Sequence, residues 1–445
     1  MTIKAFIQAV KYEKWCQILT LLMRLTVGGV FIFSGFTKGV DPWGTYYKIT
    51  DYLNALGLGS WTGSALFIAI ALAALEFILG VVIAVGAYRR SAPWVALAMM
   101  LVMTPLTLWL AVTGAVPDCG CFGDALHLSN WATFGKNVLL LLGVVYLLLF
   151  NKSLRGIYGP AVQWVVGAFS FALIMAIAYY GYFVQPLIDY RPYPVGTQLV
   201  SASNEDSDNG EDDFTFIYRK DGEEHEFTID SLPDEEEGWE YVTRYHNRRP
   251  HGKVIIQNGN NSLSIMDADG NDITMDVLAD GHRKVMLLFP DLSEVGVINS
   301  FVLNELNDAA LVSQADVIGL TPATEDEIGQ WEDLSMASYP IYHMDDSELK
   351  MVARGNPAVV YLEDGTIKWK RTLSSLNDVE QPVELSELGK DYDADSILTR
   401  MMFLYMIAML GLLAINRTHL MVRYLYYKRQ SKGTKQLTTK KPTNN

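Results

Sequence analysis

Cysteine is scarce in this 445-residue sequence. Only Cys16, Cys119 and Cys121 occur, and none of them falls between residues 189 and 397. The absence of cysteine from that stretch excludes a fold held together by disulfide bonds there. Any thiol chemistry of this protein therefore belongs to the N-terminal third of the chain.

Basic residues are also rare between residues 189 and 397. This stretch holds 44 acidic and 15 basic residues, a net charge of −29, whereas the whole chain carries −15. The remainder therefore has a net charge of +14, and half of the entire sequence is hydrophobic. Such segregation predicts an acidic soluble domain joined to apolar segments with basic flanks. A surface this acidic argues against nucleic acid as a partner.

Six apolar segments are long enough to cross a membrane, which takes about 20 largely apolar residues. The predicted spans are Gln17–Thr37, Thr62–Tyr88, Pro93–Thr113, Thr133–Phe150, Val162–Val184 and Leu398–Leu420. The first is too long for a cleavable signal peptide, and no small-residue cleavage site follows it. We therefore expect a multi-pass helical membrane protein in contact with lipid.

Lysine and arginine in the short loops predict the orientation of these spans. With six spans, one side receives the basic residues that precede the first span, those between spans two and three, those between spans four and five, and the basic tail. That side is expected to be the cytoplasm. The prediction is a protein of the bacterial inner (cytoplasmic) membrane, with its large acidic domain in the periplasm.

Two charged residues inside the predicted spans, Arg24 and Glu76, are costly in lipid and are therefore candidates for a special role. Both are expected in the cytoplasmic halves of their helices, so an intramembrane ion pair between them is predicted to lock the helices together. The alternative is a proton- or quinone-linked site.

The acidic domain begins with a predicted flexible linker over residues 189–213, followed by a small β-rich subdomain over residues 214–275. Its predicted strands are Phe214–Tyr218, Glu226–Ile229, Lys253–Ile256 and Ser262–Met266. The run from Asp267 to Asp272 predicts a hairpin turn, because its ligand spacing does not fit a calcium loop.

From residue 284 onward, strand and helix patterns alternate. The predicted strands are Lys284–Phe289, Ala315–Leu320 and Tyr339–His343, then a hairpin of Ala358–Leu362 with Thr366–Trp369. The predicted helices between them are Glu294–Asn307, Glu325–Trp331 and Ser347–Arg354. This order predicts an α/β domain with a parallel strand pair and an antiparallel hairpin.

The order of elements in residues 276–390 resembles the thioredoxin-like fold. Asn356 and Pro357 stand where that fold has its cis-proline loop, so we expect a cis peptide bond between them. Where thioredoxins carry Cys-x-x-Cys, this chain has the run from Asp291 to Glu294, which contains no thiol. The resemblance therefore implies a binding or scaffolding domain without dithiol chemistry.

Cys119 and Cys121 stand one residue apart in the loop between the third and fourth predicted spans. Disulfides persist outside the cytoplasm, and a turn at Gly120 would bring the two Cα atoms within disulfide range. The pair is therefore a candidate catalytic, redox-active disulfide. A structural disulfide is one alternative. The other is a metal site, whose short cysteine spacing is unusual and whose ligands would be Cys119, Cys121 and His127, with Asp118 or Asp124 nearby. We predict no metal site.

The Cys-Gly-Cys-Phe-Gly loop, together with Lys136 and Asn137 in the next span, resembles the DoxX/MauE family of membrane proteins. Further matches are Arg24, Gly28, Gly29, Phe31, Ser34, Gly35, Lys38, Glu76, Gly80 and Gly86. The resemblance implies a four-helix membrane domain over residues 1–155. In that family, one branch is associated with maturation of a disulfide-rich periplasmic enzyme subunit, and others with thiosulfate:quinone electron transfer.

This chain adds several segments to the four-helix core. They are a fifth transmembrane helix (residues 156–188), the linker and acidic domain, a sixth transmembrane helix (residues 396–422) and a basic cytoplasmic tail (residues 423–445). The expected fold is thus a membrane α-helical bundle with an extracytoplasmic α/β domain.

The predicted function is thiol–disulfide exchange or disulfide maturation through Cys119 and Cys121, with a periplasmic protein thiol as partner. A membrane quinone is the candidate electron acceptor. Two alternatives stay open: a non-enzymatic envelope assembly protein whose loop disulfide is structural, and a subunit of a membrane oxidoreductase complex.

Overall fold

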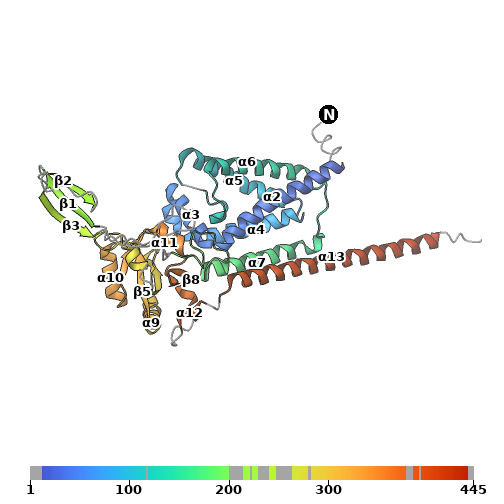
Figure 1. The fold of residues 1–445 in the computed structure, drawn as a ribbon. Coiled ribbons are helices and arrows are strands. Elements are labelled where there is room, and N and C mark those ends of the chain that lie inside the picture. Colours follow the sequence, from blue (N-terminus) through green and yellow to red (C-terminus); the bar gives the residue numbers. More distant parts are fainter. Residues whose placement is uncertain are drawn as a thin grey trace, which may run out of the picture. The chain divides into compact units, whose positions relative to one another are not determined.

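The computed structural model describes residues 13–116, 119–199, 214–220, 223–228, 240–246, 263–278, 282–376, 384–389 and 392–438 (Figure 1). The chain divides into two compact units. The first, here called the helical unit, comprises residues 1–191, 374–377 and 390–445. The second, here called the sheet unit, comprises residues 192–373 and 378–389.

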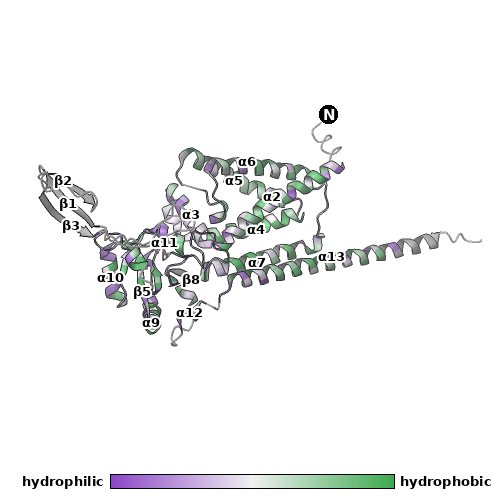
Figure 2. Ribbon diagram, in the orientation of Figure 1, coloured by the Kyte–Doolittle hydropathy of each residue, from purple (hydrophilic) through white to green (hydrophobic). Residues whose placement is uncertain are grey.

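Six helices of the helical unit are long and apolar enough to cross a membrane, within the part of the chain that the structure describes. They are α2 (Lys14–Val40), α4 (Ala65–Ala84), α5 (Ala92–Thr113), α6 (Asn130–Phe150), α7 (Gln163–Phe183) and α13 (Ala394–Thr438). Figure 2 shows that hydrophobic residues dominate these helices along their apolar stretches. The prediction of six spans is confirmed by length and composition, and α13 is longer than expected.

Glycines allow α2 and α4 to pack closely against each other. A Cβ atom added at Gly28 would lie 2.8 Å from the carbonyl oxygen of Gly80, and one added at Gly35 would lie 2.7 Å from that of Ala73. Close backbone approach through small residues is the usual way in which helices associate in lipid, where apolar burial supplies no driving force. These contacts also fix the register of the two antiparallel helices.

The chain between α2 and α4 contains a helix, α3 (Pro42–Ala55), which the sequence analysis did not predict. Asp41 caps it by accepting a hydrogen bond from the backbone N–H of Gly44 (2.9 Å), and Pro42 suits the first turn. The helix packs against α4. The helix was not predicted because its residues are mixed in polarity rather than uniformly apolar.

Helices α7 and α13 are tied to each other by polar contacts in an apolar interface. The hydroxyl groups of Ser170 on α7 and Tyr405 on α13 lie 2.9 Å apart, and the hydroxyl of Tyr158, in the segment before α7, donates to the carbonyl oxygen of Met409 on α13 (2.9 Å). The two predicted additional spans therefore belong to the same compact unit as the first four.

The sheet unit is built on a five-stranded sheet with strand order β6-β5-β4-β7-β8. The strands are β4 (Arg283–Leu288), β5 (Ala315–Thr321), β6 (Ile341–His343), β7 (Ala358–Glu363) and β8 (Thr366–Thr372). β4, β5 and β6 are parallel to one another, whereas β7 is antiparallel to both β4 and β8. The predicted parallel pair and antiparallel hairpin are confirmed.

Three longer helices accompany this sheet: α9 (Ile298–Val312), α10 (Glu325–Ser335) and α11 (Asp346–Val352). The first begins four residues later than predicted. The side chain of Asp291 accepts hydrogen bonds from the backbone N–H groups of Ser293 and Glu294, which holds a short 3₁₀ turn at the position where a helix was expected. The Asn356–Pro357 peptide bond is cis, as predicted.

A separate antiparallel sheet contains β1 (Phe214–Lys220), β2 (Glu223–Thr228) and β3 (Glu240–His246), in the order β2-β1-β3. The third strand was not predicted. The predicted strand at residues 253–256 and most of the predicted linker (residues 200–213) lie outside the described residues.

The predicted strand at residues 262–266 does not belong to that separate sheet. Leu263 and Ile265 are buried in the core of the five-stranded sheet, and Met266 bridges to His343. The predicted turn that follows is present. Asp267 donates its backbone N–H to the carbonyl oxygen of Asn271 (3.0 Å) and pairs the two arms of a hairpin.

Candidate functional site

The Cys119–Cys121 loop connects α5 to α6. α5 ends at Gly114, whose φ of 63° terminates the helix, and α6 begins after Ser129, whose side chain accepts a hydrogen bond from the N–H of Ala132. Between them, Gly120 has a φ of +59°, the left-handed conformation that glycine adopts without a steric penalty. The two cysteine Cα atoms lie 5.4 Å apart with their sulfur atoms together. This separation is within the range of a disulfide.

Side chains from two helices hold the backbone of this loop. The hydroxyl of Tyr52, on α3, donates to the carbonyl oxygen of Cys119 (2.5 Å). The hydroxyl of Ser34 and the ammonium group of Lys38, both on α2, donate to the carbonyl oxygen of Cys121 (2.7 and 2.8 Å). Both cysteine carbonyl groups are therefore anchored to the helical unit.

A buried ion pair lies directly beneath the loop. The Lys38 ammonium group is 2.7 Å from Oε2 of Glu76, and both side chains are only 6% exposed. The Ser34 hydroxyl also lies 2.7 Å from this Glu76 oxygen, so its single proton is shared between Glu76 and the carbonyl oxygen of Cys121, and it accepts a hydrogen bond from Lys38 (2.6 Å). The other oxygen, Oε1, takes part in no hydrogen bond with the described residues. A paired and hydrogen-bonded charge can be buried at tolerable cost, unlike an isolated one.

The predicted ion pair between Arg24 and Glu76 is wrong, because the helix register separates the two residues. Gly35 of α2 lies beside Ala73 of α4, and an added Cβ at Gly86 would collide with the Arg24 guanidinium group. Glu76 is therefore level with the end of α2 that carries Lys38, while Arg24 lies several turns away along the helix.

Arg24 is instead hydrogen-bonded to uncharged acceptors at the other end of the helical unit. Its guanidinium group donates to Oδ1 of Asn151 (2.6 Å) and to the carbonyl oxygens of Asn151 (2.6 Å) and Leu154 (2.8 Å). This arrangement fastens the segment after α6 to α2. The contacts indicate a structural role for Arg24. Cys16 is fully buried, with its sulfur 3.7 Å from the hydroxyl oxygen of Tyr146.

A mainly apolar cavity of about 250 Å³ lies next to the cysteine pair. Its walls come from α2, α3, α4, α5, α6 and the loop itself. Apolar residues such as Ile68, Leu72, Met100 and Leu140 form most of the lining. Cys119, Gly120 and Cys121 line it as well, so the candidate redox pair borders the cavity.

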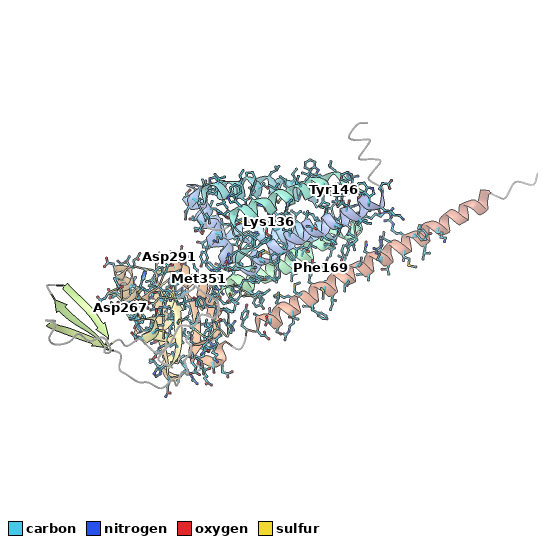
Figure 3. All side chains as sticks on the ribbon, turned by 45° about the horizontal axis from the view of Figure 1, so that its top comes forward. Lys136, Tyr146, Phe169, Asp267, Asp291 and Met351 are labelled. Atoms are coloured by element: carbon cyan, nitrogen blue, oxygen red, sulfur yellow. A yellow bond between two sulfur atoms is a disulfide. The ribbon has the colours of Figure 1, made fainter. Side chains whose placement is uncertain are left out.

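Polar side chains enter this cavity at a few points. Figure 3 places Lys136 inside the helical unit, where its ammonium group lies 4.1 Å from the centre of the Phe122 ring. Asn137, the next residue on α6, donates to the hydroxyl of Thr107 (3.1 Å). Few polar groups in an apolar concave site are typical of small-molecule binding sites.

Residues of α3 are the part of the site that sequence reasoning missed. Thr45, Lys48 and Tyr52 line the cavity from one face of that helix, as their spacing of three and four residues requires. That spacing could have indicated that these three residues share one face of a helix, but no helix was predicted in this segment. Lys38 and Ser34 were noticed only as matches to a family, and their contact with Glu76 was not predicted.

Within the described residues, no group of three or more His, Cys, Asp or Glu side chains is arranged to hold a metal ion. Asp118, which was considered as a residue near a metal site, lies outside those residues.

The fold and the site together define a multi-pass helical membrane protein with a paired-cysteine loop at one end of an apolar cavity. Residues 16–150, from α2 to α6, match the family described as methylamine utilisation protein MauE. Residues 213–247, which contain the three-stranded sheet, match a domain of unknown function, DUF8463. No curated protein matches the chain. The MauE part of the predicted resemblance is thus confirmed for residues 16–150.

Proposed function

We propose that this protein is a membrane thiol–disulfide exchange or disulfide-maturation protein that acts through Cys119 and Cys121. The observation that carries the proposal is the geometry of the loop. Two cysteines with Cα atoms 5.4 Å apart are anchored through both carbonyl groups and border an apolar cavity. Residues 16–150 match the family described as methylamine utilisation protein MauE. This agrees with the resemblance given above, which implies a branch associated with maturation of a periplasmic enzyme subunit.

In the proposed exchange, electrons and protons pass from a partner protein to the cysteine loop. A partner dithiol gives two electrons and two protons to the Cys119–Cys121 disulfide, so that the partner gains a disulfide bond and the loop becomes a dithiol. The reduced loop must then pass those electrons onward before it can act again.

A membrane quinone is the proposed acceptor of these electrons. When bound, it would supply a site that takes up two electrons and two protons. The lining fits such a molecule, because apolar walls suit its ring and tail. Lys136 and Asn137 would bind its carbonyl oxygens by hydrogen bonds. The cysteines border the same cavity.

The orientation proposed here follows the loop charges. The cysteine loop and the sheet unit would face the periplasm of a bacterial inner membrane, and the basic end of α13 the cytoplasm. The sheet unit would be thioredoxin-like, as its central parallel strands and antiparallel hairpin suggest. Lacking cysteine, it would bind the partner protein while the loop carries out exchange.

A second candidate is a non-enzymatic assembly protein in which the loop disulfide is structural. The hydrogen bonds that fix the loop favour it, since a purely structural turn would be held in the same way.

The redox state of the pair in growing cells distinguishes the two candidates. Cells are treated with a thiol-alkylating reagent of high mass before and after a pulse of a membrane-permeant reductant, and the mass of the protein is followed by electrophoresis. We expect alkylation of both thiols after the pulse and recovery of the oxidised form when the reductant is removed. The Cys119→Ser/Cys121→Ser variant provides the baseline from Cys16. A pair that stays oxidised throughout would support the structural candidate.

A further inference from the structure

We infer that Cys119 forms the mixed disulfide with the partner, and that Tyr52 and Lys38 are positioning residues that keep its sulfur reactive. The inference rests on the proposed function, to which it adds the separate roles of the two cysteines. The loop geometry, rather than the order of the two residues in the chain, distinguishes them.

The two sulfur atoms have different surroundings. The backbone N–H of Cys121 donates a hydrogen bond to the Cys119 sulfur at 3.2 Å. Among the described residues, nothing donates a hydrogen bond to the Cys121 sulfur. A hydrogen bond to the charged form of a group favours that form, so the loop stabilises a thiolate on Cys119 more than one on Cys121.

This asymmetry persists after the disulfide opens because the loop backbone is anchored independently of the sulfur atoms. Tyr52 holds the carbonyl oxygen of Cys119, while Lys38 and Ser34 hold that of Cys121. The donating N–H lies in the peptide unit between these two fixed carbonyl groups. It therefore remains directed at the Cys119 sulfur in the reduced loop.

The charges around the pair also favour thiolate formation. The residues that line the cavity include three lysines, Lys38, Lys48 and Lys136, and one carboxylate, Glu76, a net charge of +2. The carboxylate is already paired with Lys38. The methylene groups of Lys48 lie over the turn, since a Cβ at Gly120 would be 2.9 Å from its Cγ. Asp124 and His127 are the other titratable residues of the loop that the structure describes.

The reaction then follows from the thiolate. In the reduced loop, the Cys119 thiolate attacks one sulfur of a disulfide, forms the mixed disulfide and releases the other partner sulfur as a thiolate. Cys121 loses its proton, attacks the Cys119 sulfur and releases the second partner sulfur as a thiolate. The two partner thiolates become a dithiol by taking up two protons, one from Cys121 and one from solvent. The loop is oxidised by two electrons and the disulfide is reduced by two. Oxidation of a partner dithiol runs through the same mixed disulfide in reverse.

The test compares single thiols in the full-length protein, purified in detergent, with Cys16→Ser as background. Iodoacetamide alkylation is timed from pH 5 to pH 10 for the Cys121→Ser variant, which retains Cys119, and for Cys119→Ser, which retains Cys121. Both substitutions keep the backbone N–H. Each rate is divided by its value at pH 10, where both thiols are ionised, and this separates thiolate fraction from access. At pH 6 we expect the normalised rate of Cys119 to be about tenfold higher.

Two tyrosine substitutions test the positioning role. In the Cys121→Ser variant, Tyr52→Phe removes the hydroxyl that holds Cys119 and should lower the normalised rate at pH 6 severalfold. Tyr46→Phe makes the same chemical change on the same helix, where no hydrogen bond of the hydroxyl is described, and should leave the rate unchanged. Ser34→Ala probes the other anchor if Tyr52→Phe is poorly folded. Equal normalised rates for the two cysteines, or an effect of Tyr46→Phe equal to that of Tyr52→Phe, would overturn the inference.

Alkylation needs no partner protein, so this result is separate from the test of the proposed function. If Cys119 is the more reactive thiol but the loop never changes redox state in cells, the proposed function fails and the assignment of the thiolate stands. If the loop cycles in cells but Cys121 is the more reactive thiol, only the assignment fails.

Discussion

Lys38 uses all three protons of its ammonium group inside the helical unit, on Ser34, Glu76 and the carbonyl oxygen of Cys121. With this full set of acceptors, no donor of the buried lysine is left unsatisfied. The ion pair thus serves two purposes at once: it neutralises Glu76 and holds the cysteine loop.

The energetic coupling of this pair can be measured. Lys38→Met or Glu76→Leu alone leaves an uncompensated buried charge, and each should destabilise the protein by about 3–5 kcal/mol. The double variant should lose less than the sum of the two, because it leaves neither charge behind. Stability is followed by thermal unfolding of the purified protein in detergent.

The combination of Arg24→Met with Glu76→Leu is the matched control, since these residues contact different groups in the structure. Their effects should add. Additivity for Lys38 with Glu76, or strong coupling for Arg24 with Glu76, would contradict the observed pairing.

At this scale the sequence identified the charged residues but not their partners. Arg24 and Glu76 stood out because each is a charge in an apolar span. Lys38 lies just after the predicted end of its span, so it was not predicted to be buried. The choice between partners depends on the register of α2 against α4, which the glycine contacts determine and which apolar composition does not reveal.

Among the helices, the closeness of α2 and α4 at Gly35 gives a second prediction. Gly35→Ala places a methyl group against the α4 backbone, 2.7 Å from the carbonyl oxygen of Ala73, so the helices must move apart. We expect a lower thermal unfolding midpoint. We also expect a slower recovery of the oxidised Cys119–Cys121 pair, because Ser34, the residue before Gly35, anchors the cysteine loop.

Gly29→Ala is the control on the same helix, because nothing lies within 4 Å of a Cβ added there. It should be neutral or slightly stabilising, since alanine has the higher helix propensity. If both variants unfold alike, helix propensity rather than close packing explains the result.

Elements with one strong pattern were predicted well. The apolar spans and the buried strands β4, β5 and β7 have patterns that few other structures share. By contrast, the residues of α3 are mixed in polarity, and this helix was not predicted. The start of α9 was placed too early because the capping contacts of Asp291 are local hydrogen bonds that an apolar pattern does not report.

For the whole molecule, the proposed orientation can be tested by labelling single cysteines in intact cells. In a Cys16→Ser/Cys119→Ser/Cys121→Ser background, Asp333→Cys places an exposed thiol on the sheet unit, and Arg90→Cys places one in the loop between α4 and α5. A membrane-impermeant maleimide should label position 333 and miss position 90 until the cells are permeabilised. Labelling in the opposite order would reverse the proposed topology.

The segregation of charge predicted the division into an apolar helical unit and a second, acidic unit, because it results from the two solvents that the chain meets. The segregation of charge predicted no position for the proposed partner-binding surface, since an acidic surface has no unique complement.

The length of α13 has a mechanical consequence. At about 1.5 Å per residue, its 45 residues extend for roughly 68 Å, about twice the thickness of the hydrocarbon core of a bilayer. No proline interrupts it. A continuous helix of this length behaves as a stiff rod. A tilt of its membrane portion therefore displaces the basic end further than it displaces the residues inside the membrane. Whatever holds that end would in turn exert torque on α7, to which the Ser170–Tyr405 contact joins it.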